Sequence, residues 1–245
     1  MSGSSLAVRE ELAPTGVLRV AINYGNPVLA QRDRQTGEPR GVTVDIAREI
    51  GRCLDLPMAF STFDAAGKVF EAAASGALDL MFLAIDPVRA AQILFTAPYV
   101  IIEGTYIVRD DCAFRRIEEF DGPGVRIAVG KGAAYDLFLS RELKQALLVR
   151  SATSGAAVDL FVKDSLEAAA GVRQPLLAYA AAHAGFRVID ESFTAISQAV
   201  GTPTGREVSR DWLHDLVEQL KASGFIRDAL QRSDQRDAVV APACG

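Results

Sequence analysis

The stretch ALDLMFLAIDPVRAAQILFTAPYV, residues 77–100, decides the fold class. Leu78 to Ile85 is a short, continuous apolar run, which is typical of a buried strand. Asp86-Pro87 ends this run and begins a short helical turn that carries Arg89. From Ile93 to Val108 a longer run is rich in β-branched and aromatic residues, which favours a second strand. The stretch therefore predicts two strands that are joined by a short helical turn, and this turn carries Arg89.

The residues on the N-terminal side continue this alternation of strands and helices. Val17 to Asn23 and Pro57 to Phe63 are strand candidates, and Val42 to Leu54 shows apolar residues at helical spacing, with Thr43 as an expected cap. Ala66 to Ser75 is an alanine-rich helix. A strand–helix–strand–helix–strand order predicts a parallel sheet that helices cover on both faces.

A second α/β series follows residue 111. Its predicted elements are a short helix at 117–120, strands at 125–129, 146–150 and 186–189, helices at 133–143, 154–163 and 175–182, an extended run at 192–200, and helices at 206–223 and from there to about 231. The tail from residue 235 is expected to be loosely held. Runs near 95–108 and 192–200 join the halves, so we expect two lobes about a hinge: 1–100 plus 200–245, and 101–199.

Composition excludes several classes of protein. With 49% apolar and 23% charged residues, most of the 245-residue chain is expected to be ordered. A net charge of −5 and a pI near 5.2 argue against a nucleic-acid partner. No apolar run is long enough to span a membrane, since that takes roughly 18 residues.

Cysteine and histidine are scarce. Three widely spaced cysteines form neither a disulfide framework nor a zinc pattern, and two histidines poorly supply metal sites or triads, so no cofactor or metal is expected. The N-terminus MSGSSLAVREELAPTG has no apolar core of a signal peptide. We therefore expect either a cytoplasmic protein or a mature form whose signal has been removed.

Five segments together resemble a known family. They are LRVAINYGNP (18–27), GVTVDIAREIGRCLDLPMAF (41–60), the stretch at 77–100, VRIAVGKGAAYDLFL (125–139) and WLHDLVEQLKASGFIRDAL (212–230). In this order they resemble the family 3 extracytoplasmic solute-binding proteins, the amino-acid-binding components of ABC importers. The resemblance implies the α/β periplasmic-binding-protein type II fold, with a ligand between two lobes. It also implies a monomer, an ABC permease as partner and a periplasmic location.

Two anion contacts follow from the resemblance. Arg89 lies in IDPVR, which looks like the segment whose arginine clamps the ligand carboxylate, and a guanidinium pairs bidentately with such a group. Gly132, Ala133 and Ala134 form a turn into a helix whose free N–H groups suit an anion. The alternatives are a surface arginine and an ordinary strand-to-helix turn. The spacing of GKGAAY is not that of a P-loop, which argues against nucleotide binding.

The chain departs from the family where amino-acid binders hold the ligand ammonium. In GVRQPLLAY (171–179), Gln174 stands where the family segment has its own Asp, and Tyr179 stands where the ammonium-binding Asp is expected. A buried ammonium without its carboxylate costs several kcal/mol. Either Asp86 or Glu103 replaces that carboxylate, or the ligand has no α-amine. Asp86 is otherwise a helix N-cap, and Glu103 is otherwise a hinge residue that faces water.

Other predicted pocket residues change the character of the site. Leu83 and Ala84 replace hydrogen-bond donors and make its floor apolar. Asn26 stands near a family aromatic that stacks on the ligand, and either offers its amide to the ligand or holds a turn. Tyr135 and Tyr179 either form aromatic sides of the pocket or are packing residues.

The sequence therefore predicts non-enzymatic binding of a small carboxylate-bearing solute, an amino acid or an amino-acid-like organic acid, for an ABC-type transporter. One alternative is a dehydratase acting on prephenate or arogenate, with Glu103 as the acid, because some proteins that resemble this family have that activity. Glu103 would then need a pKa raised by burial. A third alternative is a cytoplasmic metabolite sensor of the same fold.

Overall fold

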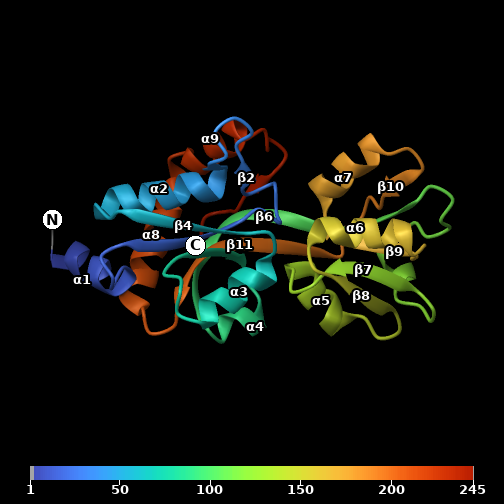
Figure 1. The fold of residues 1–245 in the computed structure, drawn as a ribbon, viewed down its shortest axis with the longest axis horizontal. Coiled ribbons are helices and arrows are strands. Elements are labelled where there is room, and N and C mark those ends of the chain that lie inside the picture. The colour runs from blue at the N-terminus through green and yellow to red at the C-terminus, as the bar shows by residue number, and fades with distance from the viewer. Residues whose placement is uncertain (1–2, 245) are drawn as a thin grey trace. The chain divides into compact units, whose positions relative to one another are not determined.

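The computed structural model describes residues 3–244, with side chains described from Leu6 onward (Figure 1). The chain divides into two compact units. Unit 1 contains the residues up to Asp64, Lys68–Ile101 and the residues from Ser197 on, and unit 2 contains Ala65–Gly67 and Ile102–Ile196. These units differ from the sequence-based lobes at 65–67, at 101 and at 197–199. Two strands, β6 (Ile93–Arg109) and β11 (Thr194–Pro203), run from one unit into the other.

Unit 1 contains the predicted strand–helix alternation. Strand β1 (Leu18–Asn23) pairs in parallel with β4 (Met58–Phe63), and a parallel bridge joins β1 to the residue before β5 (Met81–Ala84). Helices α2 (Val42–Leu54) and α3 (Ala66–Ala74) lie on either side of β4 (Figure 1). Strand β5 also pairs with β11, and that pairing is antiparallel, so the sheet is mixed where the sequence predicted a parallel one.

The cap of α2 differs from the sequence-based expectation. Its N-cap is Gly41, and Thr43 is the second residue of the helix. Gly41 has φ 113°, and a side chain there would collide with the backbone of Leu29 and Ala30. Only glycine meets both demands at low cost, which is why the cap has no side-chain hydrogen bond.

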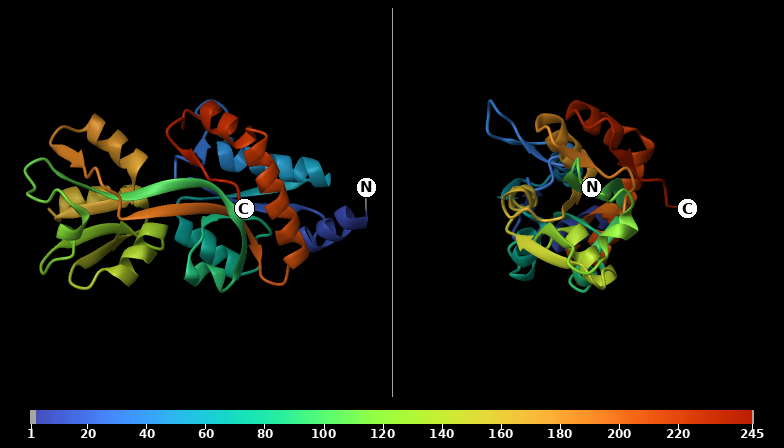
Figure 2. Two further views of the ribbon diagram at one scale, coloured as in Figure 1. Left: turned by 180° about the vertical axis from the view of Figure 1, so that it is seen from behind. Right: turned by 90° about the vertical axis from the view of Figure 1, so that its right-hand side faces the viewer.

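The terminal helices pack together in unit 1. Helix α1 (Gly3–Leu12) contacts α8 (Glu207–Ala222), as Figure 2 shows from behind, and α9 (Phe225–Arg232) follows α8. The N–H group of Ser209 in the first turn of α8 donates to the Glu11 carboxylate at 2.6 Å. This contact satisfies one of the free N–H groups at the start of α8.

The prediction of a loosely held tail is wrong. Strand β12 (Val239–Val240) pairs antiparallel with β6, and Ala238 and Ala241 are buried. The short apolar run AVVA binds the exposed backbone of a neighbouring strand, and the polar residues around it concealed that in the sequence. A second small element, the two-residue pair β2 (Gln31–Arg32) and β3 (Pro39–Arg40), lies in the loop before α2.

Unit 2 is built on parallel strands. Strand β7 (Arg126–Gly130) pairs in parallel with both β8 (Leu147–Ser151) and β9 (Ala168–Val172), and β9 pairs antiparallel with β6. The other elements of this unit are η1 (Ile117–Phe120), α5 (Ala134–Glu142), α6 (Ser154–Lys163), α7 (Arg173–Ala182) and β10 (Phe186–Val188). Strand β9 is absent from the sequence-based prediction because AAAGV contains a single β-branched residue.

Within residues 3–244, no helix has the length and apolar character needed to cross a membrane.

Candidate functional site

The predicted residues of unit 1 gather where parallel strands end. Strand β1 is parallel to β4, and the bridge from β1 to Leu80, just before β5, is also parallel. The loops that follow these three strands therefore lie at the same edge. Asn26 follows β1, and Asp86 and Arg89 follow β5. A side chain at Gly25 would collide with the carbonyl of Asp64 after β4, so the first two loops come close together at this glycine.

Arg89 lies inside unit 1 at this edge. It belongs to the short helix α4 (Pro87–Ala90) and is 1% exposed. Its Nη1 donates to the carbonyl of Ala84 at 3.0 Å, which ties the guanidinium to the end of β5. Burial lowers the pKa of Arg89 to about 10, and the Asp86 carboxylate opposes this shift. The side chain therefore stays a fixed cation at neutral pH.

Asp86 is the N-cap of α4. Its side chain accepts the N–H of Val88 at 2.9 Å, and Pro87 occupies the first helical position. Asp86 is therefore a helix N-cap, which is the alternative role that the Asp-Pro sequence indicated. Asp86 is 4% exposed, and the negative charge of its carboxylate partly offsets the effect of burial on the pKa of Arg89.

The remaining predicted residues of unit 1 have packing or turn roles. Leu83 and Ala84 are buried in β5, and Ala84 lies opposite Gln198 of β11. The side-chain oxygen of Asn26 accepts the N–H of Val28 at 3.3 Å, and its carbonyl accepts the N–H of Leu29. Asn26 thus holds the turn after β1.

The predicted residues of unit 2 gather at a second strand edge. Strands β7 and β9 are parallel, so the turn 130–134 after β7 and the start of α7 after β9 lie at the same edge. Gly104 of β6 pairs with Val172 at the end of β9, which brings Glu103 to this edge as well. The structure therefore groups Gly132, Ala133, Ala134, Glu103 and Gln174 within unit 2.

The turn after β7 has fewer free donors than the sequence indicated. The N–H of Gly132 donates to the Asp136 carboxylate at 2.9 Å, and the N–H of Ala133 donates to the carbonyl of Gly130 at 3.0 Å. The first backbone bond of α5 comes from Leu137 to the carbonyl of Ala133, which leaves the N–H of Ala134 outside the helical ladder. Of the three predicted donors, Ala134 is the one whose N–H is not used in the local backbone hydrogen bonds, as the sequence predicted.

Asp136 is a residue of this turn that sequence reasoning missed. It is 3% exposed, and Arg150 at the end of β8 pairs with it at 3.0 Å. The signal available in the sequence was its place in the first turn of a helix, where a carboxylate is stabilised by the helix dipole.

Replacing Asp136 with alanine is expected to destabilise the protein by about 1–3 kcal/mol, because the N–H of Gly132 loses its acceptor. Urea denaturation measures this effect. Asp159→Ala is the matched control, since Asp159 is an exposed acid on α6. Equal unfolding midpoints for the two variants would show that Asp136 does not hold the turn.

Glu103 is exposed and ion-paired. Its side chain is 50% exposed and pairs with Arg173, the first residue of α7. Arg173 also donates to the carbonyls of Ile189 and Asp190, at 3.2 Å and 2.8 Å. Sequence reasoning missed Arg173 because it missed β9, whose end places this arginine at the edge of the sheet.

Three predicted residues lie around α5 and α7. Tyr135 is 2% exposed and donates to Ser154 at 2.8 Å, so burial raises its pKa and its hydroxyl lies in the interior of unit 2. Tyr179 is the seventh residue of α7 and packs on Phe186. The side-chain oxygen of Gln174 is buried and accepts no hydrogen bond from the described part of the chain.

The described residues contain no group of three or more histidine, cysteine or acidic side chains that suits a metal ion. The chemistry available at both edges is that of a fixed cation, backbone donors and hydrogen-bonding side chains.

Comparison with known proteins places the chain in a family. Residues 18–232 match the model of the bacterial extracellular solute-binding proteins, family 3, and the chain belongs to this family. The resemblance seen in the sequence is therefore confirmed. No curated protein sequence matches the chain significantly.

Solved structures agree with this placement. A cysteine-binding protein from Campylobacter jejuni has a TM-score of 0.80 at 17% identity, over 97% of this chain and 99% of that one. A mutant of ArgBP from T. maritima has a TM-score of 0.78 at 19% identity, over 93% and 99%. An ancestral amino-acid-binding protein, a precursor of cyclohexadienyl dehydratase, has 0.75 at 22% identity, over 91% and 97%. The predicted periplasmic-binding-protein type II fold is confirmed.

Proposed function

We propose that this protein binds a small carboxylate-bearing solute without chemical conversion, as the solute-binding component of an ABC-type transporter. The observation that carries the proposal is Arg89, a buried and permanently charged guanidinium at a strand end, in a chain of the solute-binding family. A ligand carboxylate would give this cation a bidentate, charge-assisted partner. Membership of the family supports transport as the purpose of that binding.

Unit 2, described by itself, carries an anion contact of its own at the start of α5. The N–H of Ala134, at the start of α5, is the donor that the local hydrogen bonds leave available, and the dipole of α5 favours an anion there. Asp136 opposes that preference, because its carboxylate lies in the same turn and accepts the N–H of Gly132. The proposal therefore rests on Arg89.

The ligand proposed here is an organic acid without an α-ammonium group. Both acids that would replace the family's ammonium-binding Asp already have partners: Asp86 caps α4 and Glu103 pairs with Arg173. The residue directly after β9 is the cation Arg173, which would repel an ammonium. A carboxylate can accept more than one hydrogen bond, so these partners compete with an ammonium for the two acids and weaken its binding there.

The contacts of Glu103 favour binding over the dehydratase alternative. A carboxylic acid that donates a proton near neutral pH needs a buried, apolar site that raises its pKa. Glu103 is instead half exposed and ion-paired with Arg173, so it lacks the buried, apolar surroundings that this role requires.

A thermal-shift screen of amino acids, 2-oxo acids and dicarboxylates tests the proposed function. A ligand at 100 times its Kd stabilises the native state by about 2.7 kcal/mol, so at least one carboxylate is expected to raise Tm by several degrees. The matched comparison is leucine against 4-methyl-2-oxopentanoate, which differ at the α-carbon only. For each ligand side chain that the protein accepts, the 2-oxo acid is expected to raise Tm more than the matching amino acid. A tight complex with a common amino acid would overturn the proposal about the amine, and no response to any carboxylate would overturn the binding function.

A further inference from the structure

The C-terminal segment, residues 233–244, lies beyond the part of the chain that matches the family model. Its strand β12 pairs with Val100 and Ile101 of β6. The N–H of Ala241 extends this pairing by donating to the carbonyl of Tyr99 at 3.1 Å. The segment therefore binds three consecutive residues of one strand through its backbone.

These three residues lie at the point where β6 leaves unit 1. Ile101 is the last residue of that stretch in unit 1, and Ile102 is the first in unit 2. In unit 2, β6 pairs with β9 from Gly104 onward. Only Ile102 and Glu103 separate the part of β6 that β12 holds from the part that β9 holds.

The far end of the segment is attached to α8. Lys221, whose side chain is 5% exposed, donates to the carbonyl of Pro242 at 2.8 Å and pairs with Glu218 at 2.5 Å. Glu218 in turn accepts the N–H of Cys244 at 3.3 Å. The buried ammonium has two partners at this point, so the attachment is specific.

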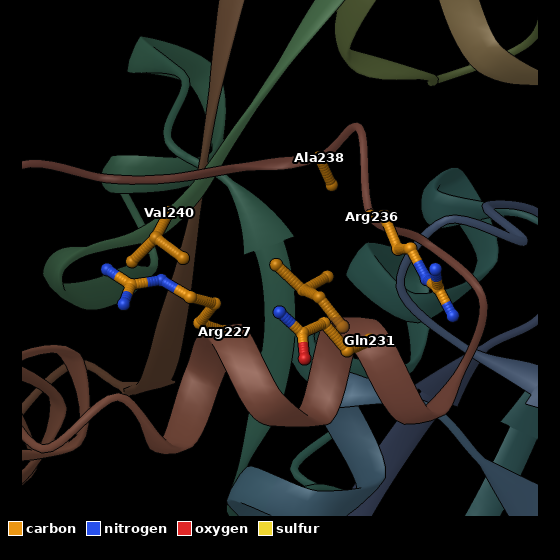
Figure 3. A pocket seen from close by; sticks show the side chains of 6 residues that line it. Arg227, Gln231, Arg236, Ala238 and Val240 are labelled. Carbon is orange, nitrogen blue, oxygen red and sulfur yellow. The ribbon is translucent and has the colours of Figure 1, made fainter.

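The segment also borders α9. Figure 3 shows a hollow between α9, which carries Arg227 and Gln231, and the segment, which carries Arg236, Ala238 and Val240. Its volume is about 320 Å³. The start of the segment is held by α9, since the N–H groups of Ser233 and Gln235 donate to carbonyls of Ala229 and Leu230, and its later half is held by the pairing with β6 and the anchor at α8.

We propose that residues 233–244 act as a strap that fastens the crossing strand β6 to α8 and restrains it from opening where it passes between the units. A strand paired along both edges opens locally less often than a strand paired along one edge. Because β6 also pairs with β11, the strap adds to the stiffness of this crossing strand. This role does not require any ligand, and its test is independent of the proposed function.

Hydrogen exchange followed by mass spectrometry on the ligand-free, full-length protein tests the strap. Ala241→Pro removes the N–H that donates to Tyr99. Ala243→Pro is the matched control, because Ala243 is exposed and its N–H makes no hydrogen bond to any described residue. In Ala241→Pro, exchange at 99–101 is expected to rise roughly two- to tenfold, the range that loss of one backbone hydrogen bond produces. Exchange at 105–107, which β9 holds, is expected to stay unchanged.

Lys221→Met provides a second variant that leaves the backbone of the segment intact and removes its anchor to Pro242. It is expected to raise exchange at the same three residues. Wild-type exchange at 99–101 in both variants would overturn the strap, and so would an equal rise at 105–107, which would indicate general destabilisation of the strand.

Discussion

Replacing Arg89 with alanine is expected to remove about half or more of the thermal stabilisation by a bound carboxylate. The variant loses a charge-assisted hydrogen bond of about 1.5–3 kcal/mol, which corresponds to roughly 10- to 150-fold weaker binding. Because Arg89 is buried, its loss also affects the ligand-free protein. The informative quantity is therefore the difference in Tm with and without ligand, measured for each variant against its own ligand-free form.

Two further variants sharpen the Arg89 experiment. Arg89→Lys keeps the charge and loses the planar fork, so it is expected to bind with intermediate affinity. Arg48→Ala is the control, since Arg48 is exposed on α2 and makes no ion pair with the residues that the structure describes. A ligand-induced shift in Arg89→Ala as large as in the control would reject Arg89 as the carboxylate partner.

Replacing Asp79 with asparagine is expected to cause the largest loss of stability. Asp79 is fully buried in unit 1 and pairs with Arg19 at 2.7 Å and with Arg206 at 3.0 Å. Breaking such a pair from one side costs about 3–5 kcal/mol, and we expect the lower value because both arginines reach solvent in part. Thermal unfolding measures it as a fall in Tm of roughly 6–12 °C.

The same residue gives a pH dependence with a definite sign. Burial raises the pKa of Asp79, but the hydrogen bonds from Arg19 and Arg206 outweigh it, so the net pKa lies below the ordinary 3.8. A carboxyl whose pKa is lowered by folding stabilises fully above its unfolded pKa, and this contribution is lost as the pH falls through the folded pKa. Wild-type stability should therefore fall more steeply below about pH 4 than that of Asp79→Asn.

Asp55→Asn is the control for both measurements. Its side chain is 90% exposed, and its pair with Arg9 spans 3.7 Å, so its removal is expected to leave Tm unchanged. A Tm for Asp79→Asn equal to that of the control would show that the buried network does not stabilise unit 1.

Helices with strong periodicity were predictable from the sequence. The bounds of α2, η1 and α6 are the predicted ones, since apolar spacing acts within a few positions, although the cap of α2 is Gly41 and not the predicted Thr43. Strand β9 and the pairing of β12 were not predictable in this way. Both elements are short and are stabilised by a neighbouring strand distant in the sequence, so tertiary pairing decides their conformation.

The predicted site residues show the same difference between local and long-range signals. Arg89 on a short helix and Asp86 as its cap follow from Asp-Pro, a local signal. The pairs Glu103–Arg173 and Asp136–Arg150 join residues from different strand ends, and only the register of β6, β7, β8 and β9 brings them together. Sequence reasoning therefore located Arg89 and missed the partners of Glu103 and Asp136.

A crystal structure of the protein with the carboxylate that stabilises it most tests the central claim directly. The account predicts that both carboxylate oxygens of the ligand lie within hydrogen-bond distance of the guanidinium of Arg89. A ligand whose carboxylate binds elsewhere, with Arg89 keeping only protein partners, would contradict it.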